Sequence, residues 1–131
     1  MNILLWILQV VLAGVFAAHG WLLVSPPPEL LPIINEEMGV VFRYTLGIAE
    51  IMGAIGILLP AATRIMPWLT EVSAACFAFV MVSATIWHIV RAEWSSAVIT
   101  FALLIISAFV AYGRWRVRPI RPKQLATTAL P

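Results

Sequence analysis

Ionisable side chains interrupt three apolar stretches of this chain that are long enough to cross a membrane. A carboxylate inside a membrane is penalised by several kcal/mol unless it is neutralised, paired or hydrated. A carboxylate and an imidazole can also move a proton or orient the polar head of a lipid-soluble molecule. We therefore predict Glu50 and His88 as catalytic residues. The predicted ligand-binding residues are His19, Arg43, Tyr44 and Arg91.

Helical spacing places these groups at a similar depth. Glu50 follows Arg43 by seven residues, which is about 10 Å along a helix. His19 lies about 10 Å before the proline run that ends its stretch, and His88 lies about 5 Å before Arg91. These residues lie on three separate stretches of the sequence, so nothing in their spacing requires them to share one depth. It predicts a polar pocket that opens toward one membrane surface.

The surroundings of Glu50 leave two interpretations open. Small residues at helical spacing, among them Gly47 and Gly53, admit a neighbouring backbone, so Glu50 is expected to face the bundle interior. His88 continues a row of small and polar residues with a period of 3.6, and we expect it to face the same interior. In the functional interpretation these residues bind a ligand. In the structural interpretation Glu50 pairs with Arg43, Arg91 or His88 and only holds the spans together.

Other reactive groups have simpler explanations. His19, Glu50 and His88 include ligand types that suit Zn or Fe, but no H-x-x-E or H-E-x-x-H spacing occurs, so we predict no metal site. Cys76 is the only cysteine, and its apolar neighbours predict a small core filler. Glu71 lies in a first helical turn with Arg64 nearby, where a carboxylate favours the helix dipole.

The composition identifies the elements that must position these groups. Of the 131 residues, 63% are hydrophobic and 11% are charged, against about 25% charged in a soluble domain. We predict an all-α membrane protein, a bundle of four transmembrane helices that forms one domain over residues 1–113. A short interfacial helix is expected within residues 29–39, and residues 114–131 are predicted to form a flexible basic tail. The predicted spans are 3–24, 40–60, 67–90 and 94–112, the second being broken near Pro60.

Basic residues predict the orientation. Arg64 and five basic residues of the tail lie on one side, and only Arg43 and Arg91 lie on the other. Both termini are therefore expected in the cytoplasm. Because the tail directly follows an apolar span, it is expected to contact the lipid surface and not nucleic acid. The expected partners are the bilayer and a lipid-soluble small molecule, with a redox partner protein and a second copy of the chain as further candidates.

Several segments resemble the DoxX-like family. Residues 44–60, with Gly47, Glu50, Gly53 and Pro60, resemble its second span, and residues 88–93 resemble the H-x-x-R-x-E end of its third. Residues 67–70 and 110–114 also fit the family pattern. The first span of the family often carries a Lys shortly after a Gly, whereas this chain has no Lys there. If that Lys pairs with a carboxylate in other members of the family, His19 or Arg43 is the candidate to replace it in this chain.

The resemblance implies a four-helix protein of the bacterial inner (plasma) membrane, from a family named after a subunit of a thiosulfate- or quinol-linked oxidase. Many members are thought to be accessory subunits. The leading hypothesis is a membrane subunit associated with quinone-linked redox chemistry, with quinone as the candidate cofactor in an outward-facing polar pocket. One alternative is a membrane-embedded enzyme that performs acid–base chemistry on a small hydrophobic substrate. The other is a purely structural or assembly subunit.

Overall fold

The computed structural model describes residues 1–123, and these residues form helices joined by short turns. No strand occurs among them. The elements are α1 (Asn2–Val24), α2 (Leu31–Met38), α3 (Val40–Thr63), α4 (Trp68–Val90), α5 (Trp94–Tyr112) and the short π-helix η1 (Gly113–Val117).

Four of the helical segments are long and apolar enough to cross a membrane. The predicted all-helical fold with four spans is confirmed. The short helix α2 lies inside the segment 29–39, where an interfacial helix was expected. The spanning segments are Asn2–Val24, Val40–Thr63, Trp68–Val90 and Trp94–Val117.

Pro60 does not end the second span, which corrects the expected boundary. Helix α3 continues through Pro60 to Thr63. A proline inside a helix removes one hydrogen bond, the one its absent N–H would donate to the carbonyl of Gly56. The helix ends instead at Arg64, whose backbone is left-handed with φ 59° and whose N–H bonds to the Pro60 carbonyl.

The basic tail also begins later than predicted. Helical structure continues through η1 to Val117, so residue 114 still belongs to the fourth span. Arg114 is buried, with 1% of its surface exposed, and is not part of a surface anchor. Residues 124–131 of the predicted tail lie outside the described residues.

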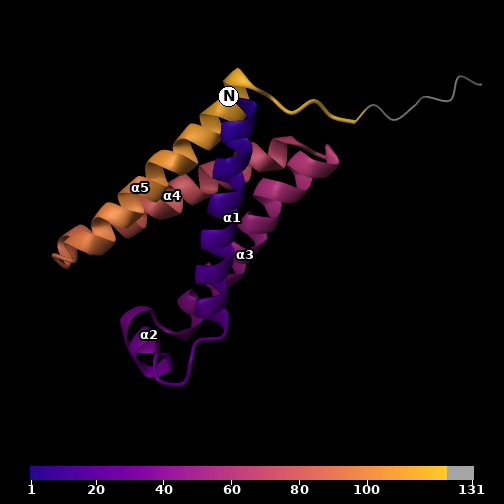
Figure 1. Ribbon diagram of the computed structural model, residues 1–131. Helices are drawn as coiled ribbons and strands as arrows, with labels where there is room; N and C mark the ends of the chain where they lie inside the picture. The colour runs from indigo at the N-terminus through magenta and orange to yellow at the C-terminus, as the bar shows by residue number, and fades with distance from the viewer. Residues whose placement is uncertain (124–131) are drawn as a thin grey trace, which may run out of the picture.

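The four long helices form two pairs. Helix α1 packs along α3, and α4 packs along α5. Figure 1 shows that α1 and α5 come together near the N-terminus and diverge from there, and that α2 lies at the opposite end of α1 and α3. We call these two ends the N-terminal end and the α2 end. The pairs are joined through α3 and α4, so polar residues on α1 and α3 meet within one pair.

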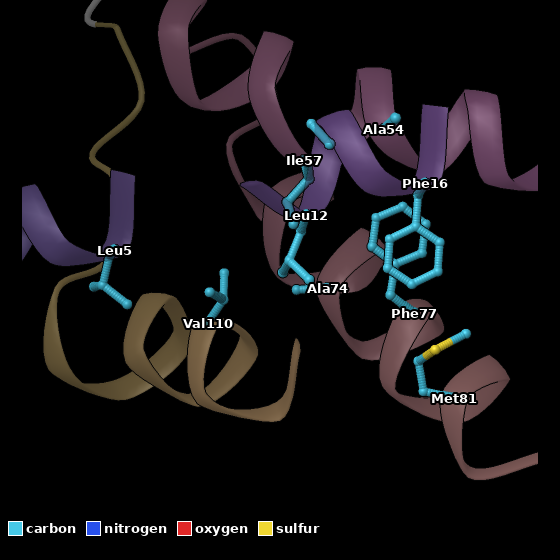
Figure 2. Packing of buried hydrophobic residues seen from close by; sticks show 10 residues of the cluster. Leu5, Leu12, Phe16, Ala54, Ile57, Ala74, Phe77, Met81 and Val110 are labelled. Carbon is cyan, nitrogen blue, oxygen red and sulfur yellow. The ribbon is translucent and has the colours of Figure 1, made fainter. Parts of the chain in front are cut away.

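Apolar contacts fix the first helix against the rest of the bundle. Phe16 of α1 stacks on Phe77 of α4 with ring centroids 3.7 Å apart and planes nearly parallel (Figure 2). Toward the N-terminal end, Leu5 packs beside Val110 of α5 in the same buried cluster. Aromatic pairs gain extra energy in offset or edge-to-face arrangements, so this nearly face-to-face pair contributes mainly through the area that it buries. These contacts hold α1 in one register against its neighbours.

Candidate functional site

Glu50 pairs with His19 across the interface between α1 and α3. The Oε2 atom of Glu50 lies 2.7 Å from Nδ1 of His19. The Glu50 side chain is 2% exposed, whereas the His19 side chain is 50% exposed. The buried carboxyl group therefore holds Nδ1 of an imidazole whose side chain is half exposed.

Two glycines bring these side chains together. A Cβ atom on Gly20 would lie 2.7 Å from the carbonyl oxygen of Gly47, and a Cβ on Gly47 would lie 2.8 Å from the carbonyl oxygen of Gly20. The backbones of α1 and α3 can approach this closely only where both residues lack a side chain. His19 is adjacent to one of these glycines, and Glu50 lies one turn from the other. The small residues around Glu50 thus do admit a neighbouring backbone.

The second oxygen of the Glu50 carboxyl group faces a different environment. Oε1 is buried and has no hydrogen-bond partner within residues 1–123. Glu50 lines a cavity of about 60 Å³ between α3 and α4. Cys76 also lines this cavity and is exposed, which corrects its prediction as a core filler. The cavity has room for water, but ligand pockets usually exceed about 300 Å³.

Arg43 takes a different partner from the one that the structural interpretation offered. Its side chain is 2% exposed and donates from Nη1 to the Leu23 carbonyl oxygen, and from Nε to Oδ1 of Asn35 at 2.9 Å. The guanidinium carbon also lies 4.2 Å from the centre of the Tyr44 ring. Carbonyls in the last turn of a helix have no partner within the helix, so Arg43 caps α1 and ties it to α2. Glu50 is paired by His19 instead.

His88 and Glu50 do not share one pocket, which corrects the expectation of a common interior. Nδ1 of His88 lies 2.6 Å from Oε2 of Glu93, in the turn after α4. Arg91 bonds to the other oxygen of Glu93 at 2.8 Å and to Glu37 of α2 at 2.8 Å. The Arg91 guanidinium also lies over the Trp87 ring. These residues form a separate surface cluster at the α2 end.

The charges of this cluster stabilise one another. The hydrogen bond from Arg91 lowers the pKa of the Glu93 carboxyl, and the hydrogen bond to His88 lowers it further. The same bond to Glu93, with the nearby Glu37 carboxylate, raises the pKa of Arg91. Exposed pairs of this kind contribute little to stability, but they connect α2 to the turn between α4 and α5.

The metal hypothesis gains no geometric support within residues 1–123. No group of three His, Cys, Asp or Glu side chains placed to hold an ion occurs in this part of the chain. His19 and Glu50 are together, and His88 is bound elsewhere.

A third polar cluster, at the N-terminal end, was missed by the sequence reasoning. Buried Arg114 donates from Nε to Oε1 of Gln9 at 2.6 Å and from Nη1 to Oδ1 of Asn2 at 2.7 Å. Gln9, fully buried, donates in turn to the Ile57 carbonyl oxygen at 2.8 Å. A signal was available, because Asn2 and Gln9 are seven residues apart and therefore lie on one helix face.

Together the fold and these polar pairs define a multi-pass membrane protein with a carboxylate–imidazole pair inside the bundle. The model of the DoxX-like family matches residues 7–110. The chain therefore belongs to the DoxX-like family. No curated protein and no solved structure shows a significant match to it.

Proposed function

We propose that this protein binds a quinone or quinol head group from the bilayer at the His19–Glu50 pair and exchanges a proton with it. The observation that carries the proposal is the asymmetry of this pair. Glu50 is 2% exposed and His19 is 50% exposed, and their side chains are 2.7 Å apart. The carboxylate acts on the ligand through the imidazole that it orients.

The chemistry follows from which atoms are occupied. With a carboxylate at Glu50, Nδ1 of His19 carries the proton and donates it to Oε2. The Nε2 atom is then the free acceptor on the exposed edge of the ring. A carboxylate behind an imidazole fixes its tautomer and stabilises the imidazolium that forms when Nε2 takes a proton. A quinol hydroxyl approaching from the lipid supplies such a proton, and a quinone carbonyl accepts a hydrogen bond from the protonated ring.

Access from the lipid is favoured over entry into the bundle. The cavity beside Glu50 is about 60 Å³, too small for a ligand ring, and it lies between α3 and α4, whereas His19 belongs to α1. We therefore place the ring of the ligand against the exposed edge of His19. Glu50 lines this cavity, which has the volume for water beside the carboxyl group.

The remaining predicted site residues take supporting roles in this proposal. Arg43, stacked with Tyr44, holds the end of α1 that follows His19. His88 and Arg91 belong to the surface cluster at the α2 end and do not contact the proposed ligand. We assign them to the connection between α2 and the turn after α4.

We further propose that the α2 end faces the periplasm of a bacterial inner membrane. The backbone N–H of Lys123 bonds to the Arg64 carbonyl oxygen, which brings the basic residues of the last segment beside the end of α3. Basic residues favour the cytoplasmic side. In this orientation the His19–Glu50 pair lies in the periplasmic half. Oxidation of a quinol releases two protons and two electrons: His19 takes one proton, periplasmic water takes the other, and a redox partner protein accepts both electrons.

Native mass spectrometry of the gently purified protein tests the proposal. We expect the wild type and His88→Gln to retain a quinone mass, and Glu50→Gln and His19→Gln to lose it. His88→Gln is the matched control because it removes the other imidazole of the chain. If no variant or wild type carries a ligand, and Glu50→Gln dissociates or unfolds, Glu50 is only structural and the proposal is wrong.

The same pair supports a second candidate function, acid–base catalysis on a small hydrophobic substrate without electron transfer. The favouring observation is again the ordered imidazole with one free nitrogen. The two functions separate in the same experiment. A retained small molecule without a redox-active ring, lost in Glu50→Gln, selects the acid–base enzyme over the quinone subunit.

A further inference from the structure

The N-terminal end of the bundle carries most of the positive charge of the chain. Six of the eight basic residues lie at this end, where α3 and α5 finish and α4 begins. Within residues 1–123 none of the six forms an ion pair, and the one carboxylate at this end, Glu71, stays unpaired although Arg64 is near in sequence. At the α2 end, by contrast, Arg91 pairs with two glutamates. The six basic residues are Arg64, Arg114, Arg116, Arg118, Arg121 and Lys123.

The backbone folds the last described segment back over this end. Helical structure stops at Val117, and the chain then extends from the end of α5 toward the turn that joins α3 and α4 (Figure 1). There the N–H of Lys123 donates to the Arg64 carbonyl oxygen at 3.1 Å. We call residues 118–123 the returning segment. It places Lys123 beside Arg64, with Arg121 only two residues before, so cations from distant parts of the sequence share one surface.

The side chains of this surface are available to a ligand. Four of them are exposed and make no side-chain hydrogen bond within residues 1–123; these are Arg64, Arg118, Arg121 and Lys123. Arg114, buried at the same end, bonds only to neutral amides, and its Nη2 atom has no partner among the described residues. No described carboxylate therefore offsets the charge of this end, which favours an anion as its partner.

The position of these cations favours a lipid phosphate. They lie at or just beyond the ends of membrane-spanning helices, where the head groups of the bilayer begin. Trp6 and Trp115, side chains typical of the head-group level, lie at the same end, each with a guanidinium over its ring. We propose that Arg64 and the returning segment bind the head group of an anionic phospholipid, whose phosphate is contacted by Arg64, Arg121 and Lys123.

Lipid binding by the full chain in a nonionic detergent tests this site. Native mass spectrometry counts the phospholipids retained as dioleoylphosphatidylglycerol is added. Dioleoylphosphatidylcholine is the matched ligand control, because it has the same acyl chains and a phosphate but no net charge. We expect phosphatidylglycerol to bind about tenfold more tightly or better, since each Lys or Arg near an anionic lipid contributes about fivefold. Added salt should reduce this preference by screening exposed charges.

Variants assign the binding to the returning segment. Arg121→Gln combined with Lys123→Gln removes two exposed charges and is expected to weaken phosphatidylglycerol binding by about 25-fold, with phosphatidylcholine binding unchanged. Arg121→Lys combined with Lys123→Arg keeps both charges and should bind as the wild type does. Arg91→Gln removes an exposed arginine at the α2 end and is the matched control, with no change expected.

Three results would overturn the site: equal affinities for the two lipids, unchanged phosphatidylglycerol binding in the double glutamine variant, or an equal loss in Arg91→Gln. Inorganic phosphate at the concentration of the lipid is expected not to displace it; displacement would make this a site for free phosphate and overturn the lipid proposal. Helical content measured by circular dichroism shows that each variant is folded. The His19–Glu50 pair lies toward the opposite end, so failure of quinone binding has no bearing on these outcomes.

Discussion

Two polar clusters tie α1 to its neighbours, one at each end, and they differ in what surrounds them. At the N-terminal end, Gln9 and Arg114 are both nearly inaccessible, and the guanidinium also lies 5.4 Å from the Trp6 ring. Nearer the α2 end, the buried Glu50 binds a histidine that is half exposed, and Glu50 also lines a small cavity. Both clusters place an ionisable side chain inside the membrane.

The difference separates a structural role from a functional one. The hydrogen bond between Gln9 and Arg114 is inaccessible, so no ligand reaches it and its role is to hold the helices together. A carboxylate that orients an exposed imidazole leaves a nitrogen free to react. Intramembrane ionisable residues are often functional. The partner of Glu50 is half exposed and Gln9, the buried partner of Arg114, is not, so only the Glu50 cluster can reach a ligand. The predictions below test this distinction.

The largest effect is expected from Arg114→Ala. It leaves the buried side-chain oxygen of Gln9 without its donor and also removes the bond to the exposed Asn2, so the free energy of unfolding should fall by about 2–3 kcal/mol. Denaturant titration in detergent measures the loss. Arg116→Ala, which removes an exposed guanidinium two residues away, is the control. Equal stability of the two variants would show that the buried network is not structural.

A smaller loss is expected from Gly20→Ala. The added Cβ would lie 2.7 Å from the Gly47 carbonyl oxygen, so α1 and α3 must separate, at a cost of about 1–2 kcal/mol. The same separation should lengthen the His19–Glu50 contact and abolish quinone binding. Gly14→Ala is the matched control on α1, because nothing lies within 4 Å of its added Cβ. Quinone binding retained in Gly20→Ala would argue against the close approach as the basis of the site.

Glu50→Gln should change function much more than stability. The amide can still bond to His19, and hydrogen bonds between membrane helices contribute about 0.6 kcal/mol on average, so we expect unfolding to change by less than about 1 kcal/mol. Quinone binding should nevertheless be lost, because a neutral amide cannot stabilise the imidazolium. Measuring both thermal unfolding and quinone binding of the variant separates its effect on stability from its effect on function. A loss of stability as large as that of Arg114→Ala would make both clusters structural.

The surface cluster at the α2 end should give the smallest effect, and one that depends on pH. Because Arg91 lowers the pKa of Glu93 in the folded protein, the pair stabilises above the unfolded pKa of the carboxyl and ceases to do so as pH falls through the lower folded value. Protection of α2 in hydrogen exchange should be constant above about pH 5 and decline below about pH 4. Glu93→Gln should remove this dependence. If α2 loses protection at low pH in Glu93→Gln as it does in the wild type, the pH dependence belongs to another group.

The sequence predicted the elements better than their pairing. Hydropathy and proline placement are local signals, and they located four spans and the short helix before the second one. The continuation of α3 beyond Pro60 was missed because a single absent N–H weakens a helix that packing still supports. The burial of Arg114 was missed because its partners are on α1, more than a hundred residues away in sequence.

The candidate site shows the same limit. Small residues around Glu50 correctly indicated a close backbone. The residues alone offered Arg43, Arg91 or His88 as the partner of Glu50, and His19 was named only through the family resemblance, as a candidate substitute for an absent lysine. His88 was grouped with Glu50 because both lie at a similar depth, yet depth along a helix does not fix the direction in which a side chain points. Glu93, five residues after His88 in the following turn, proved to be its partner.

The most direct test of the central claim is the nitrogen NMR spectrum of the two histidines in nanodiscs, with ¹⁵N-labelled histidine. The chain contains only His19 and His88, so each spectrum carries its own control. Addition of a short-chain quinol should shift the Nε2 resonance of His19 and leave His88 unchanged, and Glu50→Gln should abolish the shift. A shift at His88 alone, or at neither histidine, would contradict a ligand site at the His19–Glu50 pair.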